Sequence, residues 1–281
     1  MKILIVGGNS SIGKALKSVL SKNYEVITAG RTNCDSYINL EDPITEIKIP
    51  DYVDIVINAV AHFGGQTGKL IYEAENINVL GLLKLCEVSY NASVKHFISI
   101  SSIFSFLKED AQQYSIYSIS KRHAEEVIKE FCRTYSLPLT ILRPGQVYGN
   151  VLDFKSKQPF LYHIISQAAK GLDINLYGSN DAKRNFIHID DLTQIIEKVI
   201  EQTTLGSFDC LYMHDVTYSQ IAKAAYSVFN KKGNINFIKD KPDIPDNIFE
   251  KDFSLYEKID FYPEISIEKG IKKIAGTSQI L

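Results

Sequence analysis

The sequence of 281 residues lacks an apolar run near the roughly 20 residues that a membrane-spanning helix requires. Its first residues do not have the layout of a signal peptide. A formal net charge of −2 provides no basic excess for binding nucleic acid. We therefore expect a soluble cytoplasmic protein whose partners include neither nucleic acid nor a membrane.

Cysteine is also scarce, and the four thiols (Cys34, Cys86, Cys132 and Cys210) are scattered without a C-x-x-C pair. This distribution predicts neither a zinc site nor a disulfide framework, so we expect reduced packing residues and no bound metal. Internal repeats and low-complexity segments are absent as well. With 45% apolar residues, the chain can form one large core, or one domain with a smaller appendage.

The sequence opens with a short unbroken apolar run at 1–6, which is typical of a strand buried on both faces of a parallel sheet. A glycine-bearing turn at 7–13 and a helical pattern at 14–22 follow. This order places backbone N–H groups and a positive helix end where a pyrophosphate can bind, so the turn is a predicted dinucleotide site. Ser10 replaces the middle glycine of a G-x-x-G-x-x-G pattern and offers a hydroxyl to phosphate. The alternative is an ordinary strand-to-helix turn.

A second predicted strand, at 24–29, ends just before Arg31 and Thr32. An NAD site of this type usually has an acidic residue about 20 positions after the glycines, whereas an arginine accommodates the 2′-phosphate of NADP. Because Arg31 stands in that region, we predict that NADP(H) is favoured over NAD(H). The alternative is an arginine in a solvated loop.

Further apolar strands at 53–59 and 96–100 are separated by a long helical pattern at 69–90. This alternation predicts an α/β fold with a doubly wound parallel sheet and right-handed connections. Ligands bind beyond the carboxyl ends of such strands, so the segments 58–61 and 99–102 should face the cofactor. His62 follows one of these segments, but a loop histidine is more often a surface group, and we assign it no catalytic role.

Tyr117 and Lys121 stand four residues apart at the head of a predicted helix whose apolar positions continue to Phe131. Residues at this spacing share one helix face, so the phenol and the ammonium should point the same way. A nearby cation favours the phenolate and lowers a tyrosine pKa from about 10. The pattern therefore predicts an oxidoreductase site, unless it is a half-buried tyrosine beside a surface lysine.

Several segments, taken in order, resemble one family. They are 7–13, 58–61, 78–81, 101–102, 117–121, 142–149 and 184–191. Together they resemble the extended short-chain dehydrogenase/reductase family, in its NAD-dependent epimerase/dehydratase group that acts on nucleotide sugars. The resemblance covers nearly the whole chain. It implies a Rossmann-like NAD(P)-binding domain at 1–150 and a smaller α/β substrate-binding portion at 151–281, with some chain crossing back to the first domain.

The resemblance also implies roles for individual residues. Tyr117 is the implied catalytic acid/base, and Lys121 holds the nicotinamide ribose and lowers the tyrosine pKa. Ser102 hydrogen-bonds the substrate oxygen, with Ser101 as its alternative because neighbours in an extended segment point to opposite faces. The implied cofactor-binding residues are Gly7, Ser10, Ser11, Ile12, Gly13, Arg31, Thr32, Asn58, Ala59, Val60, Ala61, Tyr117, Lys121 and Pro144.

In the second half, Arg184 is implied to bind the diphosphate of the nucleotide sugar, a bidentate task that suits a guanidinium. Asn185 stands where the family often has Asp, which removes a charge partner of Arg184. Tyr148 is expected to line the sugar pocket. Arg143 is expected to be structural or near the cofactor, and Asp191 to be structural.

Family members that dehydrate the sugar carry an acidic pair directly after the Ser/Thr position, where this chain has Ile103 and Phe104. Reduction or epimerisation therefore remains, and Arg31 favours a reductase because reduced cofactor in the cell is mostly NADPH. We predict an NADPH-dependent reductase of a nucleotide-linked 4-keto-6-deoxy sugar in surface polysaccharide synthesis. The alternatives are a nucleotide-sugar epimerase that retains NAD(P), and a non-catalytic NADP-binding protein on the same fold.

In the family, the helices that correspond to 69–90 and 118–135 pair across a two-fold axis, so the resemblance implies a homodimer. The alternative is a solvated monomer surface. The identity of the sugar is expected to depend on loops at 63–68, 104–113 and 151–160.

Overall fold

The computed structural model describes residues 1–150 and 153–277, which form two compact units. The first unit comprises 1–144, 193–210 and 252–260, and the second comprises 145–192, 211–251 and the residues from 261 onward. The division therefore falls at residue 144 instead of 150. The segments 193–210 and 252–260 are the parts of the chain that cross back.

The first unit is built on a seven-stranded sheet with the order β11-β6-β5-β4-β1-β2-β3. Its strands are β1 (Lys2–Val6), β2 (Glu25–Gly30), β3 (Ser36–Tyr37), β4 (Ile55–Asn58), β5 (His96–Ile100), β6 (Leu139–Pro144) and β11 (Gly206–Cys210). Every neighbouring pair is parallel, so all the carboxyl ends lie along one edge. The strand order reverses between β1 and β4, which is where such sheets bind ligands. The predicted doubly wound fold is confirmed.

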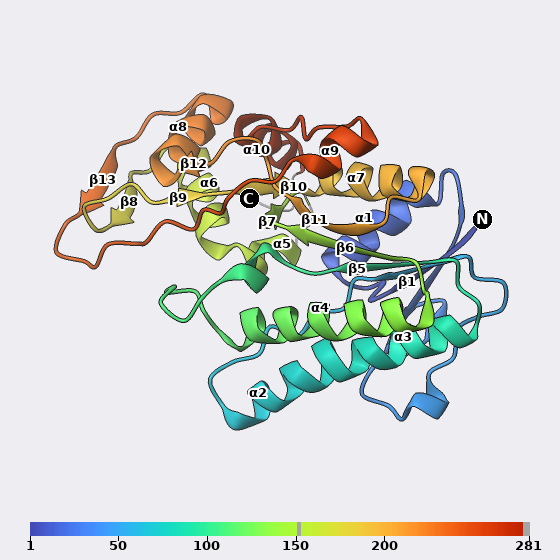
Figure 1. Cartoon of the computed structure of the whole chain (residues 1–281). Coiled ribbons are helices and arrows are strands. Elements are labelled where there is room, and N and C mark those ends of the chain that lie inside the picture. The colour runs from blue at the N-terminus through green and yellow to red at the C-terminus, as the bar shows by residue number, and fades with distance from the viewer. Residues whose placement is uncertain (151–152, 278–281) are drawn as a thin grey trace. The chain divides into compact units, whose positions relative to one another are not determined.

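Helices cover both faces of this sheet (Figure 1). They are α1 (Ser11–Leu20), α2 (Gly68–Glu75), α3 (Leu82–Asn91), α4 (Ile116–Tyr135), α9 (Ser254–Ile259) and the later part of α7 (Ile189–Gln202), with short 3₁₀ turns η1 (Ile44–Glu46) and η3 (Ile103–Phe106). The main core lies between the sheet and the pair α3 and α4, where Phe97, Leu85 and Ile128 are fully buried. This core holds the helix that carries Tyr117 against the carboxyl edge.

The single helix expected at 69–90 is interrupted by a π-helical turn, η2 (Asn76–Gly81). Within η2, Asn78 is buried and its side-chain amide donates to the carbonyl oxygen of His62 at 2.8 Å and to Ser120 Oγ at 2.9 Å. Turns of this kind are frequent at functional sites. Here the turn directs a polar group toward α4 and the loop after β4.

The second unit contains three two-stranded sheets, β10 with β7, β12 with β9, and β13 with β8. Its strands are β7 (Gln146–Tyr148), β8 (Ile174–Tyr177), β9 (Lys183–Arg184), β10 (Phe186–His188), β12 (Val216–Thr217) and β13 (Ile235–Ile238), and its helices are α5 (Asp153–Lys157), α6 (Pro159–Lys170), α8 (Tyr218–Phe229), α10 (Ile267–Ala275) and the start of α7. Val151 and Leu152, in the loop expected to affect sugar choice, lie outside the described residues. None of the helices in the described ranges is long and apolar enough to cross a membrane.

Candidate active site

The turn between β1 and α1 needs glycine at two positions. Gly7 has φ +87°, and a Cβ there would lie 2.8 Å from the carbonyl carbon of Ala59. A Cβ on Gly13 would overlap the carbonyl oxygen of Gly7. Ser10 begins the helix by accepting a hydrogen bond from the Gly13 N–H at 3.0 Å. The turn therefore presents backbone and a positive helix end at close range, as an anion site requires.

A pocket of about 250 Å³ opens beside this turn in the first unit. Of the predicted cofactor-binding residues, its lining includes Gly7, Ser10, Arg31, Thr32, Ala59, Val60 and Ala61. The predicted residues that do not line it are Ser11, Ile12, Gly13, Asn58, Tyr117, Lys121 and Pro144. Asn58 and Pro144 are buried at the carboxyl ends of β4 and β6. The pocket thus brings together residues from three separate segments that the sequence predicts to bind the cofactor.

Arg31 and Thr32 lie at the rim of this pocket, directly after β2. The Thr32 carbonyl oxygen accepts a hydrogen bond from the Asn9 side-chain amide, which joins the rim to the glycine turn. The Arg31 guanidinium lies 3.6 Å from Oε2 of Glu41, and both side chains are exposed. Glu41 carries no signal in the sequence, because its position in the pocket is set by the fold of the segment after β3.

Ser101 and Ser102 follow β5 and point to different partners. Ser101 Oγ donates to Glu125 Oε1 at 2.6 Å. Ser102 Oγ accepts from the Phe104 N–H at 3.3 Å and lies close enough to the Tyr117 hydroxyl to lower the pKa of the phenol. Ser102 is therefore the member of the pair that reaches the tyrosine.

Tyr117 and Lys121 lie one turn apart on α4, with Lys121 only 4% exposed. The Lys121 Nζ lies 5.9 Å from the centre of the Tyr117 ring and donates to the carbonyl oxygen of Ile100 at 3.1 Å. Burial raises the pKa of Tyr117 to about 12, and the nearby Ser102 hydroxyl opposes only part of this shift. Burial also lowers the pKa of Lys121 to about 8. The net shift of the tyrosine pKa is upward, opposite to the lowering expected from Lys121, because loss of hydration dominates.

Phe63 was not singled out from the sequence, yet its ring stacks on Tyr117, with centroids 5.0 Å apart and an interplanar angle of 22°. It belongs to the loop between β4 and α2 and is 53% exposed. Asn78 supports the same region, because Ser120 Oγ accepts from Asn78 and donates to the Tyr117 carbonyl oxygen at 3.1 Å. The sequence carried a signal for Asn78, in the segment 78–81, but not for Phe63.

In the second unit, Arg184 is 5% exposed at β9. Its guanidinium donates to the carbonyl oxygens of Lys183 at 2.7 Å and Pro245 at 2.8 Å, and it lies 4.9 Å from the centre of the Tyr218 ring. These contacts are with neutral groups. They fix the guanidinium without cancelling its charge.

Asn185 is engaged elsewhere and does not determine how Arg184 is held. Its side-chain amide donates to the Tyr212 carbonyl oxygen at 2.9 Å and to Asp215 Oδ1 at 2.8 Å, while its oxygen accepts from the Tyr212 N–H at 2.9 Å. An aspartate could not make these two donor contacts. Asn185 therefore fits the local network of this chain.

Tyr148 is fully buried inside the second unit, so the prediction that it lines the sugar pocket is wrong. Its hydroxyl donates to the Ser266 carbonyl oxygen at 3.3 Å, and its ring meets Phe186 and His188 edge-on. A Cβ on Gly270 would also contact this ring. The motif around Tyr148 did not reveal which face of β7 is covered.

Arg143 and Asp191 have structural partners. Arg143 donates to Glu125 at 2.6 to 2.9 Å and to Asp209 at 3.2 Å, all within the first unit. Asp191 accepts from the backbone N–H groups of Glu264 at 3.1 Å and Ile265 at 3.0 Å in the second unit. Both contacts agree with structural roles.

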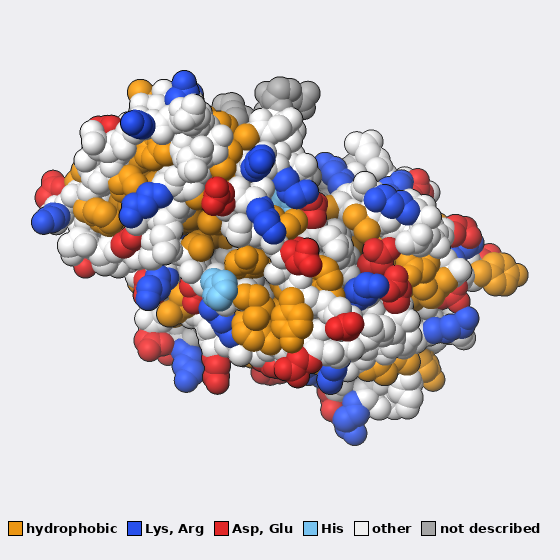
Figure 2. Space-filling view, turned by 90° about the horizontal axis from the view of Figure 1, so that it is seen from above, with side chains coloured by type: hydrophobic (Ala, Val, Ile, Leu, Met, Phe, Trp, Pro, Cys, Tyr) orange, Lys and Arg blue, Asp and Glu red, His pale blue; other side chains and the backbone are white. Residues whose placement is uncertain are grey.

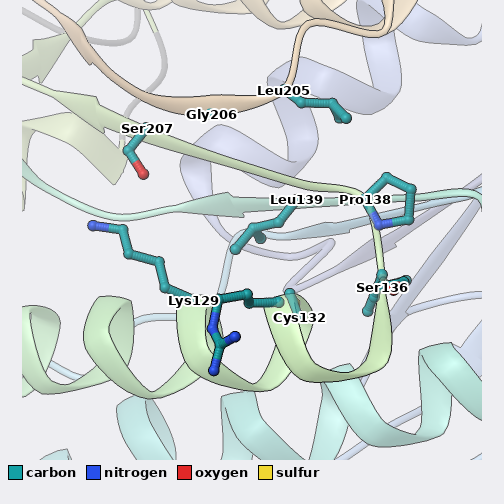
Figure 3. A pocket seen from close by; sticks show the side chains of 10 residues that line it. Lys129, Cys132, Ser136, Pro138, Leu139, Leu205, Gly206 and Ser207 are labelled. Carbon is teal, nitrogen blue, oxygen red and sulfur yellow. The ribbon is translucent and has the colours of Figure 1, made fainter.

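A larger pocket, of about 440 Å³, lies in the first unit between the end of α4 and the starts of β6 and β11 (Figure 3). Its lining includes Cys132, Leu139 and Leu205, and none of the predicted site residues. Among the described residues, no group of three or more His, Cys, Asp and Glu side chains is placed to hold a metal ion. On the face drawn in Figure 2, the described Lys and Arg side chains are interspersed with Asp and Glu, without a continuous basic patch.

Comparison with known proteins decides the family. A model of the NAD dependent epimerase/dehydratase family matches residues 3–208. The chain belongs to this family. The predicted resemblance is therefore confirmed, as is the prediction of an enzyme class that uses a nicotinamide cofactor.

Relatives and solved structures extend over almost the whole chain. CDP-abequose synthase from Salmonella muenchen is 27% identical, covering 99% of this chain and 98% of its own. GDP-L-fucose synthase from Escherichia coli is 23% identical over 96% of this chain and 94% of its own. The structure of UDP-glucose 4-epimerase from Thermotoga maritima, bound to UDP-glucose, superposes with a TM-score of 0.80 at 20% identity, covering 99% of both chains. The structure of RMD from Pseudomonas aeruginosa with NADPH has a TM-score of 0.78 at 15% identity, covering 98% of each chain.

Proposed function

We propose that this protein is an NADPH-dependent reductase of a nucleotide-linked 4-keto-6-deoxy sugar. The observation that carries the proposal is the cluster of Ser102, Tyr117 and Lys121 in the first unit, where the Lys121 Nζ lies 5.9 Å from the centre of the Tyr117 ring and Ser102 is close enough to lower the pKa of the phenol. A protein that only bound NADP would have no use for a half-buried phenol held in this way. The names of the relatives, which include a UDP-4-keto-L-rhamnose-reductase as part of a trifunctional protein from Arabidopsis thaliana, agree with nucleotide-sugar substrates.

The pocket beside β1 and α1 fits a dinucleotide. The close approach at Gly7 and the helix start capped by Ser10 suit a pyrophosphate, while Arg31 and Thr32 would lie beside an adenosine 2′-phosphate. Lys121 would hold the nicotinamide ribose. When bound, the reduced nicotinamide supplies the hydride.

The chain's own groups then supply the proton. A pKa of about 12 means that Tyr117 carries its proton at neutral pH, which is the form needed to protonate the oxygen of a reduced carbonyl. Ser102 would hydrogen-bond the same substrate oxygen and orient it toward the phenol.

Dehydration needs an additional acid and base that this site does not provide next to Ser102. Ile103 and Phe104 occupy the two following positions, at the start of η3, and Ile103 is 1% exposed in the core. Neither side chain can exchange a proton. The proposal is therefore limited to a hydride and one proton per turnover.

Arg184 would bind the substrate diphosphate. Its guanidinium is fixed by two carbonyl oxygens and the ring of Tyr218, so a charged group is presented by a rigid set of neutral contacts. Charge-assisted bonds from arginine to phosphate are strong and can be bidentate. Tyr148 has no part in this proposal because it is buried.

The same proposal includes a cytoplasmic homodimer that serves surface polysaccharide synthesis. Helices α2 to α4 expose apolar side chains, including Ile71, Tyr72, Tyr90 and Tyr135. Such a surface suits a second copy of the chain. Sedimentation of the purified protein measures this directly: a monomer at micromolar concentration would contradict it.

The test is NADPH oxidation by purified protein in the presence of nucleotide-linked 4-keto-6-deoxy sugars made in place by a dehydratase. We expect one NADPH to be consumed for each sugar reduced. The loss of nicotinamide absorbance measures the NADPH consumed, and mass spectrometry identifies the sugar product. The control is Tyr117→Phe under the same conditions. No consumption, together with release of a dinucleotide when the wild-type protein is denatured, would favour an epimerase instead.

A further inference from the structure

The rim of the dinucleotide pocket carries two opposite charges. Arg31 is 70% exposed and Glu41 is 36% exposed, and their side chains approach to 3.6 Å. Both line the pocket, Arg31 after β2 and Glu41 after β3. The pair is therefore accessible to a ligand in the pocket.

The contact between the two side chains is weak. An exposed ion pair with this separation contributes little to stability, because water screens the charges and the side chains lose freedom. Arg31 can leave Glu41 for a ligand at small cost. The Glu41 carboxylate, however, remains at the rim after the arginine has turned to its new partner.

The two residues have opposite preferences for the adenosine ribose. A 2′-phosphate is attracted by the guanidinium of Arg31, which offers several N–H donors in one plane. The same phosphate is repelled by the carboxylate of Glu41. An unphosphorylated 2′-hydroxyl behaves in the reverse way, since it can donate a hydrogen bond to a carboxylate, as acidic residues do in NAD sites of this fold.

We propose that Glu41 is a specificity-determining residue that opposes Arg31 and reduces the preference for NADPH over NADH. The inference rests on the proposed dinucleotide site. Arg31 then does not set the preference between the two cofactors alone. Glu41 enters the pocket through the fold, in a segment that follows β3.

Direct binding of NADPH and NADH to Glu41→Gln tests the proposal without turnover. We measure both dissociation constants by isothermal titration calorimetry. NADPH should bind about tenfold more tightly than to wild type, a change of about 1.4 kcal/mol. NADH should bind equally well or a few-fold more weakly. The NADPH gain should shrink at high salt, because salt screens exposed charges.

Glu46→Gln is the matched control. Glu46 is also an exposed glutamate, on η1, and it is not among the residues that line the pocket. Its replacement should leave the ratio of the two dissociation constants unchanged. An unchanged ratio in Glu41→Gln as well, or an equal gain for NADPH and NADH, would overturn the inference. A wild-type protein that binds neither dinucleotide would instead contradict the proposed function.

Discussion

Buried arginines in the two units have different partners. Arg143, in the first unit, lies between the carboxylates of Glu125 and Asp209. Arg184, in the second unit, is as deeply buried but is held by two carbonyl oxygens and the Tyr218 ring. Carboxylates neutralise the charge of Arg143, which leaves it little attraction for a ligand. Neutral groups position Arg184 without neutralising it, so its charge can still attract an anionic ligand. We therefore assign stability to the first arginine and substrate binding to the second.

The largest effect is expected from Tyr117→Phe, which tests whether the chemistry lies in the first unit alone. Loss of the phenolic proton removes the general acid, a group that contributes roughly 10²- to 10⁴-fold to such reactions. We expect kcat to fall by that factor while the dissociation constant of NADPH stays unchanged. Steady-state kinetics and dinucleotide binding measure the two quantities. Full turnover by this variant would remove Tyr117 from the mechanism.

The next effect is on the stability of the first unit. Arg143→Met leaves Asp209 buried without its cation and leaves Glu125 with only Lys129, at 3.3 Å, which costs about 3–5 kcal/mol of the free energy of unfolding when one partner of a buried pair is removed. Urea unfolding of wild type and variant measures this. A loss below about 1 kcal/mol, the value of a surface pair, would contradict the structural assignment.

The stability difference in Arg143→Met should depend on pH. Burial raises the pKa of Glu125, but hydrogen bonds from Arg143 and Ser101 lower it, and the net pKa lies below the ordinary value. The wild-type carboxylate therefore stabilises the fold above the unfolded pKa of about 4.3, and this contribution is lost as the pH falls. Without the arginine, only Ser101 and Lys129 oppose the effect of burial, so the pKa of this carboxyl should rise. The two proteins should differ most near neutral pH and least in acid.

Arg184→Met should affect binding more than stability, in contrast to Arg143→Met. Loss of charge-assisted bonds to a diphosphate costs about 2 kcal/mol, so KM for the nucleotide sugar should rise roughly 30-fold. The free energy of unfolding should change less than in Arg143→Met, because no buried carboxylate loses its partner. Arg184→Lys keeps the charge but loses the planar fork, and should fall between wild type and Arg184→Met. The comparison between the two arginines fails if Arg184→Met unfolds as readily as Arg143→Met with KM unchanged.

Local patterns predicted much of the fold. The strand predicted at 96–100 agrees with β5 residue for residue, because a short apolar run between turn residues is a strong signal. The π-helical turn at 76–81 was missed, since the predicted helix at 69–90 runs through it.

The sequence predicted only those site residues whose location follows from their place at the end of a strand or at the start of a helix. Ser102 could be paired with Tyr117 because one ends a strand and the other begins a helix at the same edge of the sheet. Burial could not be read in the same way. The pKa of Tyr117 is raised and Tyr148 is enclosed because of residues far away in sequence. Phe63 and Glu41 reach their places on loops, whose paths local propensity does not determine.

The smallest effect is expected from Phe63→Ala, which uncovers the reacting group of the first unit without changing any charge. The Phe63 ring stacks on Tyr117 at 5.0 Å and keeps water from one face of the phenol. Since burial is the main cause of the raised pKa of Tyr117, its removal should lower that pKa by about one pH unit, or about 1.4 kcal/mol. Reduction needs the protonated phenol, so kcat/KM is retained below the tyrosine pKa and lost above it. The alkaline limb of the kcat/KM profile should therefore move to lower pH in Phe63→Ala. Phe63→Leu keeps an apolar cover and should restore the wild-type limb; if both variants keep that limb, solvent exclusion by Phe63 does not set the tyrosine pKa.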